Sequence, residues 1–322
     1  MKKRLLCTLM IASIAFTGCQ NSSNELLAYK DTAVAKGQSV DNRITQADYF
    51  AKNITVVTKE DNVGGDQQLT SGATLLIDVT DNKVIYADHA FDKMYPASLT
   101  KLLTALVVFK YGEMTDSVTV SENAFKIADI GAKVCGYKEG DVLTLDTLLN
   151  SLLIYSGNDA AIAIAEHVGG SEEAFVTMMN KEAQSIGAVQ SNFMNSHGLH
   201  DDNQFTTVYD MYLIMNELLT YDTFRSIISK NTYTSEYKNK DGNDQEKAFD
   251  STNSYLNGDA EPVSGISITG GLSGATNKAG NCLILLCKDS KGKEYISLIL
   301  NASDSDTLYS QMNHLLSMAG AE

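Results

Sequence analysis

Apolar positions recur with two different periods along the 322 residues of this chain, and the periods divide it into regions. Short apolar runs, which predict β-strands, occupy residues 54–58, 74–79, 83–87, 265–269, 281–288 and 294–300. Polar residues 80–82 make the second and third of these runs a predicted β-hairpin. Longer apolar or amphipathic segments, which predict helices, occupy residues 96–112, 143–154, 160–167, 175–186, 208–219 and 305–319. Residues 118–195 are mostly helix or turn in this interpretation, and residues 235–258 are a polar stretch. Strands at both ends with helices between them predict an α/β (α+β) fold, in which one sheet is built from both termini around a helical insertion.

The first residues differ from the rest of the chain. A basic start at residues 2–4 precedes an apolar segment at residues 5–16, which is too short to span a bilayer stably. Small residues then precede Cys19, and this order resembles a bacterial lipoprotein signal, with cleavage before Cys19 and lipid on its sulfur. An ordinary secretory signal with a chance cysteine is the alternative. We therefore expect a signal peptide at residues 1–18, a polar lipid-anchored tether at residues 19–48, and an extracytoplasmic location at a bacterial cell membrane. Residues 49–322 are expected to form one domain without a C-terminal accessory domain.

The predicted helix at residues 96–112 carries two polar side chains where its apolar segment begins. Pro96 suits the first turn of a helix and Gly112 suits its C-terminal cap. Apolar residues fill nearly every position after Lys101, so the helix is expected to be buried on most sides. Ser98 and Lys101 are three positions apart, on one helix face, so their side chains can touch. Because burial shifts a lysine toward its neutral form, Lys101 can accept the hydroxyl proton of Ser98, which makes Ser98 a candidate nucleophile.

A second polar cluster lies in the turn between two apolar helical segments. It contains Ser156 and Asn158, and the flanking segments would hold both side chains rigidly, as a functional site requires. Helix capping is the alternative, because Ser, Asn and Asp favour such positions. Both patterns are short. Ser-x-x-Lys recurs at residues 235–238 and 290–293, and Ser-x-Asn recurs at residues 22–24 and 251–253, in each case in polar sequence.

Composition and charge narrow the classes of function. Apolar residues make up 43% of the chain and charged residues 20%, which is typical of a soluble globular protein, and a formal net charge of −15 argues against a nucleic-acid partner. The cysteines beyond residue 19 are Cys135, Cys282 and Cys287, an odd number that argues against a disulfide framework. We interpret them as buried core residues, with Cys282 and Cys287 on opposite sides of one strand. The histidines and glycine pairs match no metal or phosphate-loop motif, so no metal and no cofactor is expected.

Four short motifs together resemble those of the penicillin-binding proteins. They read PASLTK at residues 96–101, YSGNDAA at 155–161, NSHGL at 195–199 and FTTVYD at 205–210. The last two narrow the resemblance to the serine-type D-alanyl-D-alanine carboxypeptidases, and the similarity extends from about residue 50 to the C-terminus. It implies a β-lactamase/transpeptidase-like fold, in which an antiparallel sheet flanked by helices and a helical subdomain enclose a cleft.

The resemblance also implies a role for each motif residue. Ser98 would attack the carbonyl between two D-alanines and Lys101 would be the general base. Ser156 would relay a proton and Asn158 would hold the substrate amide. Backbone N–H groups of Ser98 and Ala275 would form the oxyanion hole. The implied partners are peptidoglycan stem peptides that end in D-Ala-D-Ala, and β-lactams as covalent inhibitors that acylate the same serine.

The third motif departs from the family pattern, which is Lys-Thr-Gly on a strand at the edge of the cleft, followed by Thr and then Ala-Gly-x-Cys. Alignment on AGNC at residues 279–282 places Leu272 at the lysine and Ser273 at the first threonine. In the family that lysine helps to bind the substrate's terminal carboxylate. Leucine cannot do so, and the loss of a hydrogen bond to a charged group weakens binding by roughly tenfold to a hundredfold. The expected substrate-binding residues of this segment are Ser273, Gly274, Ala275 and Thr276.

The sequence therefore predicts a serine D-alanyl-D-alanine carboxypeptidase that acts through an acyl-enzyme on Ser98, with activity weakened by Leu272. The alternative is a protein of the same fold that binds cell-wall peptide with little or no turnover. A class A β-lactamase would carry a Glu-x-x-x-Asn loop after the Ser-x-Asn motif, and the sequence has none there. An α/β-hydrolase elbow, suggested by GLSGA at residues 271–275, would need a helix next, whereas a turn and a strand are predicted.

Overall fold

A computed structural model describes residues 53–127 and 132–320, and these belong to a compact unit that runs from Phe50 to Glu322. The expected signal peptide at residues 1–18, the tether at residues 19–48 and the lipid-accepting Cys19 lie outside the described residues. Within the described ranges, every helix is too short or too polar to cross a bilayer.

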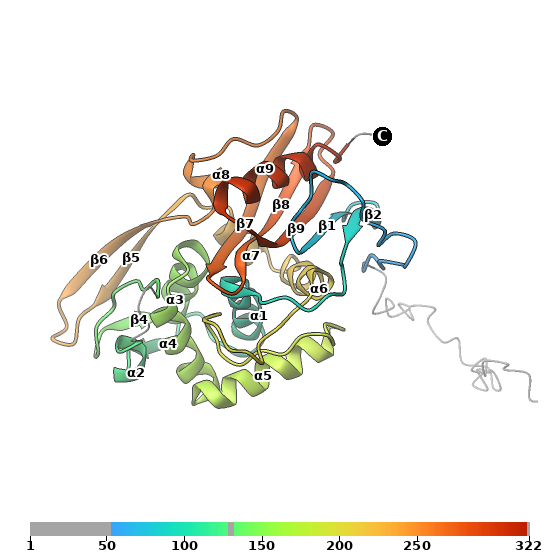
Figure 1. Ribbon diagram of the computed structural model, residues 1–322. Helices are drawn as coiled ribbons and strands as arrows, with labels where there is room; N and C mark the ends of the chain where they lie inside the picture. Colours follow the sequence, from blue (N-terminus) through green and yellow to red (C-terminus); the bar gives the residue numbers. More distant parts are fainter. Residues whose placement is uncertain (1–52, 128–131, 321–322) are drawn as a thin grey trace, which may run out of the picture. The chain divides into compact units, whose positions relative to one another are not determined.

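The centre of this unit is a five-stranded antiparallel sheet (Figure 1). In spatial order its strands are β2 (Lys83–Asp88), β1 (Ala73–Asp78), β9 (Glu294–Ala302), β8 (Gly280–Asp289) and β7 (Ile266–Thr276). Strand β1, from the start of the unit, pairs along its whole length with β9, from the end. The prediction of one sheet built from both termini is confirmed, and so is the predicted hairpin, which is formed by β1 and β2.

Apolar side chains cover both faces of this sheet. Along β8, Cys282, Ile284 and Leu286 belong to one core, whereas Leu283, Leu285 and Cys287 belong to a second core on the opposite face. Helix α9 (Ser305–Leu316) covers the second core with Leu308, Met312, Leu315 and Leu316. Helices α1 (Thr100–Tyr111) and α6 (Val208–Leu218) lie on the other side of the sheet (Figure 1). Among the described residues, Cys135, Cys282 and Cys287 are buried, free thiols, and the prediction that Cys282 and Cys287 face opposite sides is confirmed.

The remaining helices lie between β2 and β7 in the chain, as the predicted helical insertion requires. They are α2 (Glu122–Phe125), α3 (Leu145–Asn150), a π-helical turn (Ser151–Tyr155), α4 (Asn158–Gly169), α5 (Glu172–Ser185), α7 (Asp222–Ile228) and α8 (Ser254–Asn257). Side-chain caps fix where several of them begin, because a hydroxyl accepts from an otherwise unpaired N–H of the first turn. The hydroxyls of Thr144, Ser171 and Thr207 cap α3, α5 and α6 in this way.

Two predictions of secondary structure were wrong. Residues 54–58 form no strand; instead the backbone N–H of Thr55 donates to the Tyr212 hydroxyl (2.8 Å) on α6. A second sheet lies mostly in two regions that were predicted otherwise, residues 118–195 as helix or turn and residues 235–258 as a polar stretch. Its strands, in spatial order, are β3 (Ser117–Thr119), β4 (Val142–Thr144), β5 (Thr232–Lys238) and β6 (Asp244–Asp250). Strands β5 and β6 form a long hairpin that extends away from the helices (Figure 1). Most side chains of this hairpin are exposed on both faces, so its sequence lacks the alternation by which a half-buried strand is recognised.

A buried tyrosine holds this hairpin to the helices. Tyr137 is 1% exposed, and its hydroxyl oxygen lies 2.6 Å from Ser151 Oγ and 2.8 Å from Ser235 Oγ on β5. Tyr137→Phe removes that hydroxyl and takes its hydrogen bond from the buried Ser235 hydroxyl, whereas Ser151 keeps its bond to the Thr147 carbonyl (2.9 Å). We expect the free energy of unfolding to fall by about 1–3 kcal/mol, measured by urea denaturation.

The matched control for this variant is Tyr237→Phe. The ring of Tyr237 packs edge-on against Tyr137, with 5.3 Å between ring centroids, but its hydroxyl lies outside this chain of hydrogen bonds. The control should change stability by less than about 0.5 kcal/mol. Equal effects of the two substitutions would show that ring packing, and not the hydroxyl chain, attaches the hairpin.

Candidate active site

Ser98 lies in a 3₁₀ turn, Ala97–Leu99, that leads directly into α1. Ala97 has a φ of +47°, a left-handed conformation that is strained for a residue other than glycine. The turn leaves Ser98 partly exposed, while Leu99 and the first nine residues of α1 are buried. The backbone therefore presents the Ser98 hydroxyl at a surface and carries Lys101, one turn further on, into the interior. The expected helix thus begins as a 3₁₀ turn, and its expected end at Gly112 is confirmed.

Lys101 is completely buried, and its ammonium group is held by neutral oxygens. Its Nζ donates to Asn158 Oδ1 (2.7 Å), to the backbone carbonyl of His197 (2.6 Å) and, at a longer 3.2 Å, to Ser98 Oγ. Burial lowers the pKa of Lys101 to about 7, against the opposing influence of Cys135 and Asp159. A substantial fraction of Lys101 is therefore neutral near neutral pH.

The three contacts of Lys101 match the bonding capacity of a neutral amine. Such an amine has two N–H donors and one lone pair. The two carbonyl oxygens, from Asn158 and His197, can only accept, so they occupy both donors. The lone pair is then left for the hydroxyl proton of Ser98. The arrangement can therefore remove the proton of Ser98 as its oxygen attacks an electrophile.

The two carbonyl acceptors are fixed by tight local geometry. Asn158 begins α4. It comes two residues after Ser156, whose φ of +67° is again left-handed and which follows the π-helical turn Ser151–Tyr155. Gly198, with a φ of +90°, follows His197 and passes very close to the 3₁₀ turn that carries Ser98. A Cβ at Gly198 would lie 1.9 Å from the carbonyl oxygen of Ala97. Only glycine allows the His197 carbonyl to approach Lys101 from this side.

Strand β7 closes the other side of Ser98. A Cβ at Gly274 would lie 2.6 Å from the backbone nitrogen of Ser98, so the strand and the 3₁₀ turn that carries Ser98 are in direct contact. Between them opens a cavity of about 300 Å³. Its lining residues are Ser98, Lys133, Ser156, Thr252, Ser254, Ser273, Gly274, Ala275, Asn281, Cys282, Ser305, Leu308 and Tyr309. The structure thus brings together in one cavity both candidate serines and three of the four substrate-binding residues expected from the third motif.

The side chains of the third motif have different environments. Leu272 is 1% exposed and lies in the apolar core between the sheet and α1. Ser273 donates from its hydroxyl to the carbonyl of Thr252 (2.8 Å), and the Thr276 hydroxyl accepts from Ala279 N–H (3.0 Å) in the β7–β8 turn. Thr276 is therefore part of a turn and does not line the cavity. Strand β7 itself supplies the cavity with no charged side chain.

Two features of this site were not predicted from the sequence. One is Lys133, which lines the cavity about 20 residues before Ser156 in the chain. The other is the buried carboxylate of Asp159, which accepts hydrogen bonds from the backbone N–H groups of Cys135 (2.8 Å), Gly136 (2.8 Å) and Tyr137 (3.2 Å). These bonds anchor the loop that carries Lys133 to the start of α4.

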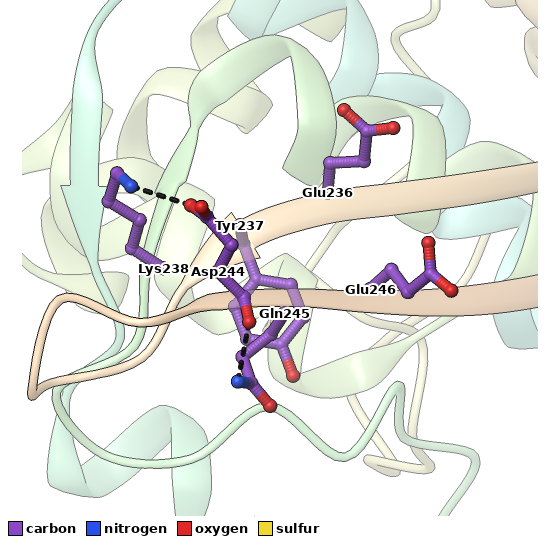
Figure 2. Close-up of a pocket in the computed structure, with 6 residues that line it drawn as sticks. All are labelled: Glu236, Tyr237, Lys238, Asp244, Gln245 and Glu246. Carbon is purple, nitrogen blue, oxygen red and sulfur yellow. Dashed lines mark hydrogen bonds and ion pairs between the residues drawn. The ribbon is translucent and has the colours of Figure 1, made fainter.

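Not every hollow in the described residues has such chemistry. One of about 540 Å³ lies on the β5–β6 hairpin, where Lys238 pairs with Asp244 (2.6 Å) (Figure 2). Its lining residues come only from the two strands of the hairpin, and none is a serine, cysteine or histidine. Among the residues the structure describes, no group of three or more His, Cys, Asp or Glu side chains could hold a metal ion.

Comparison with known proteins shows the family. The profile of the D-alanyl-D-alanine carboxypeptidases matches residues 56–304, which is most of the chain and includes all the motifs described above. The chain belongs to this family. The resemblance found in the four motifs is thereby confirmed.

Curated relatives agree with this membership. The chain is 30% identical over 252 residues to D-alanyl-D-alanine carboxypeptidase DacF of Bacillus subtilis, covering 77% of this chain and 61% of the relative. It is 37% identical over 155 residues to D-alanyl-D-alanine carboxypeptidase DacC of Escherichia coli, covering 46% of this chain and 39% of the relative. The matched part thus spans between about two fifths and three fifths of these relatives.

Solved structures share the fold. The Streptomyces K15 DD-transpeptidase superposes with a TM-score of 0.72 at 24% identity, covering 79% of this chain and 98% of the other. The D-alanyl-D-alanine carboxypeptidase DacD of Francisella tularensis superposes with a TM-score of 0.68 at 23% identity, covering 83% of this chain and 73% of the other. The predicted transpeptidase-like fold is confirmed.

The lowered pKa of Lys101 makes the reactivity of Ser98 dependent on pH. Only the neutral amine accepts a proton, so the second-order rate of Ser98 labelling by a fluorescent penicillin should rise with pH and level off above about 7. Asn158→Asp places a carboxylate beside the Lys101 amine and raises the pKa of Lys101, so the midpoint of the pH–rate curve should move to higher pH. Labelling rates measured between pH 5.5 and 9.5 test both statements. A flat wild-type profile would exclude Lys101 as the base.

Proposed function

We propose that this protein is a serine D-alanyl-D-alanine carboxypeptidase that removes the terminal D-alanine from peptidoglycan stem peptides. The observation that carries the proposal is the bonding of Lys101. Its buried amine has both donors engaged by carbonyl oxygens and lies 3.2 Å from Ser98 Oγ. A serine activated in this way, beside an open cavity, is suited to attack an acyl carbon. Membership of the family supplies the substrate class.

The reaction follows from these positions. Ser98 Oγ attacks the carbonyl carbon between the two D-alanines, and its proton passes to Lys101 Nζ. The C–N bond then breaks, and Ser156, which lines the same cavity, relays a proton to the departing amine of D-alanine. Water next attacks the ester on Ser98, which releases the shortened peptide and restores the hydroxyl. A β-lactam would acylate Ser98 by the same first step and form a covalent adduct.

Negative charge develops on the attacked carbonyl oxygen, and backbone N–H groups are the available donors. Ser98 and Ala275 are proposed for this role, one on each side of the cavity. Strand β7 approaches the turn that carries Ser98 closely at Gly274. This contact supports the assignment, since it brings the segments of Ser98 and Ala275 together. Asn158 keeps its oxygen on Lys101, so only its amide NH₂ remains to meet the substrate.

The finer expectations concern turnover and location. Leu272 is apolar and buried, which supports weakened turnover, and a protein that binds cell-wall peptide without hydrolysing it is the second candidate function. Cys19, after its apolar segment, supports a lipoprotein held on the outer side of a bacterial membrane. Both are proposals that rest on individual residues.

Mass mapping of a penicillin adduct tests the nucleophile. We expect one fluorescent penicillin per chain, on the peptide that contains Ser98, and loss of labelling by more than a hundredfold in Ser98→Ala. Ser235→Ala is the matched control, because Ser235 also belongs to a Ser-x-x-Lys pattern but lies on β5 outside the cavity. Label on another residue would contradict the assignment of Ser98.

Release of D-alanine separates the two candidate functions. Catalytic release of D-alanine from a D-Ala-D-Ala peptide by the wild-type protein, without penicillin, supports the carboxypeptidase. Labelling of Ser98 without release of D-alanine would identify a binding protein.

A further inference from the structure

The cavity beside Ser98 contains an unusual distribution of charge. Among its described lining residues, hydroxyl groups predominate and Lys133 is the one charged side chain. Lys101 is buried behind the nucleophile and engaged with neutral oxygens. A ligand that enters this cavity therefore meets a single cation, close to the serines that would carry out the chemistry.

Residues before and after Ser156 in the chain hold Lys133 in place. Its carbonyl oxygen accepts from the backbone N–H of Asn158 (2.8 Å). Its Nζ lies 4.2 Å from the centroid of the Tyr155 ring, a cation–π contact. The residues on either side of Ser156 thus hold both the backbone and the side chain of Lys133. The hydrogen bonds from the next residues to Asp159 fix the same loop.

The proposed substrate places a carboxylate within reach of this cation. Its terminal carboxylate lies one residue beyond the attacked carbonyl, within roughly 4–5 Å of it, since consecutive Cα atoms are about 3.8 Å apart. Both groups must fit in the cavity of about 300 Å³ that Ser98 and Lys133 line together. Strand β7 offers no cation there, because Leu272 is buried in the core.

We propose that Lys133 binds the terminal carboxylate of the substrate and so supplies the positive charge that the third motif lacks. This inference rests on the proposed carboxypeptidase function for the identity of the ligand. Ser254, also in the lining, is placed to add a neutral hydrogen bond to the same carboxylate.

The environment of Lys133 agrees with this role. Partial desolvation of its ammonium group lowers the pKa of Lys133, and Cys135 and Asp250 oppose this shift. Lys133 also borders a second hollow, of about 670 Å³, which Asp250 lines. A bound carboxylate would favour the charged form of Lys133, because an opposite charge at short range raises the pKa of an amine.

Peptide binding without turnover tests the proposal. In a Ser98→Ala background, calorimetry would compare an N-acylated peptide ending in D-Ala-D-Ala with the same peptide carrying a C-terminal amide. We expect the carboxylate form to bind about tenfold to a hundredfold more tightly. Lys133→Met should abolish this preference while it leaves the affinity for the amide unchanged, and Lys133→Arg should keep the preference.

Lys93→Met is the matched control. Lys93 is also an exposed lysine whose Nζ lies over an aromatic ring, 3.9 Å from the centroid of Phe205, but it does not line the cavity. It should leave both affinities unchanged. A carboxylate preference that persists in Lys133→Met, an equal loss for both peptides, or no preference in the parent protein would overturn the proposal.

Turnover by the protein with Ser98 intact separates this inference from the function on which it rests. A protein that prefers the carboxylate through Lys133 but releases no D-alanine would support the role of Lys133 and contradict the carboxypeptidase. Release of D-alanine at equal kcat/KM by wild type and Lys133→Met would support the carboxypeptidase and contradict the role of Lys133.

Discussion

The burial of one amine constrains the rest of this structure. An ammonium ion without a carboxylate partner is costly in an apolar interior, so Lys101 survives there only because neutral oxygens receive its N–H groups and its pKa is low. Those oxygens come from two segments distant in sequence, at Asn158 and His197. Loss of either would leave a donor unsatisfied. The strained turns before Ser98 and Asn158, and the glycine after His197, are the backbone cost of bringing three segments to one nitrogen.

The two lysines of the site, Lys101 and Lys133, differ in their proposed functions and in their surroundings. Lys101 lies behind Ser98 and, as the proposed base, must lose its charge to act, whereas Lys133 lies in the cavity and acts, as proposed, by keeping its charge. The structure gives them different surroundings accordingly: complete burial among carbonyls for one, and an exposed position over the ring of Tyr155 for the other. Leu272 belongs to the apolar core, so β7 contributes backbone and hydroxyl groups to the cavity but no charge.

The sequence revealed the parts of the site that depend on local spacing. The i, i+3 relation of Ser98 and Lys101 and the apolar helix behind them are visible in the chain, and the continuous apolar run within residues 281–288 predicted that strand. The partners of Lys101 were not predictable from spacing alone, because one is a backbone carbonyl and both come from elsewhere in the fold. Lys133 lay in unremarkable sequence. The β5–β6 hairpin was missed because polar residues occupy both of its faces, and residues 54–58 were misread because an apolar run without a neighbouring strand has nothing to pair with.

The pairing of β1 with β9 has a consequence for how the site is assembled. The two strands are more than 200 residues apart in the chain, and β7 is joined to β1 only through β8 and β9. Contacts between such distant segments require the closure of a long loop before they contribute any stability, which slows folding. The wall of the cavity that β7 forms therefore depends on the last strand to be synthesised. A growing chain can form α1, with Ser98 at its start, well before it can form the cavity in which Ser98 is useful.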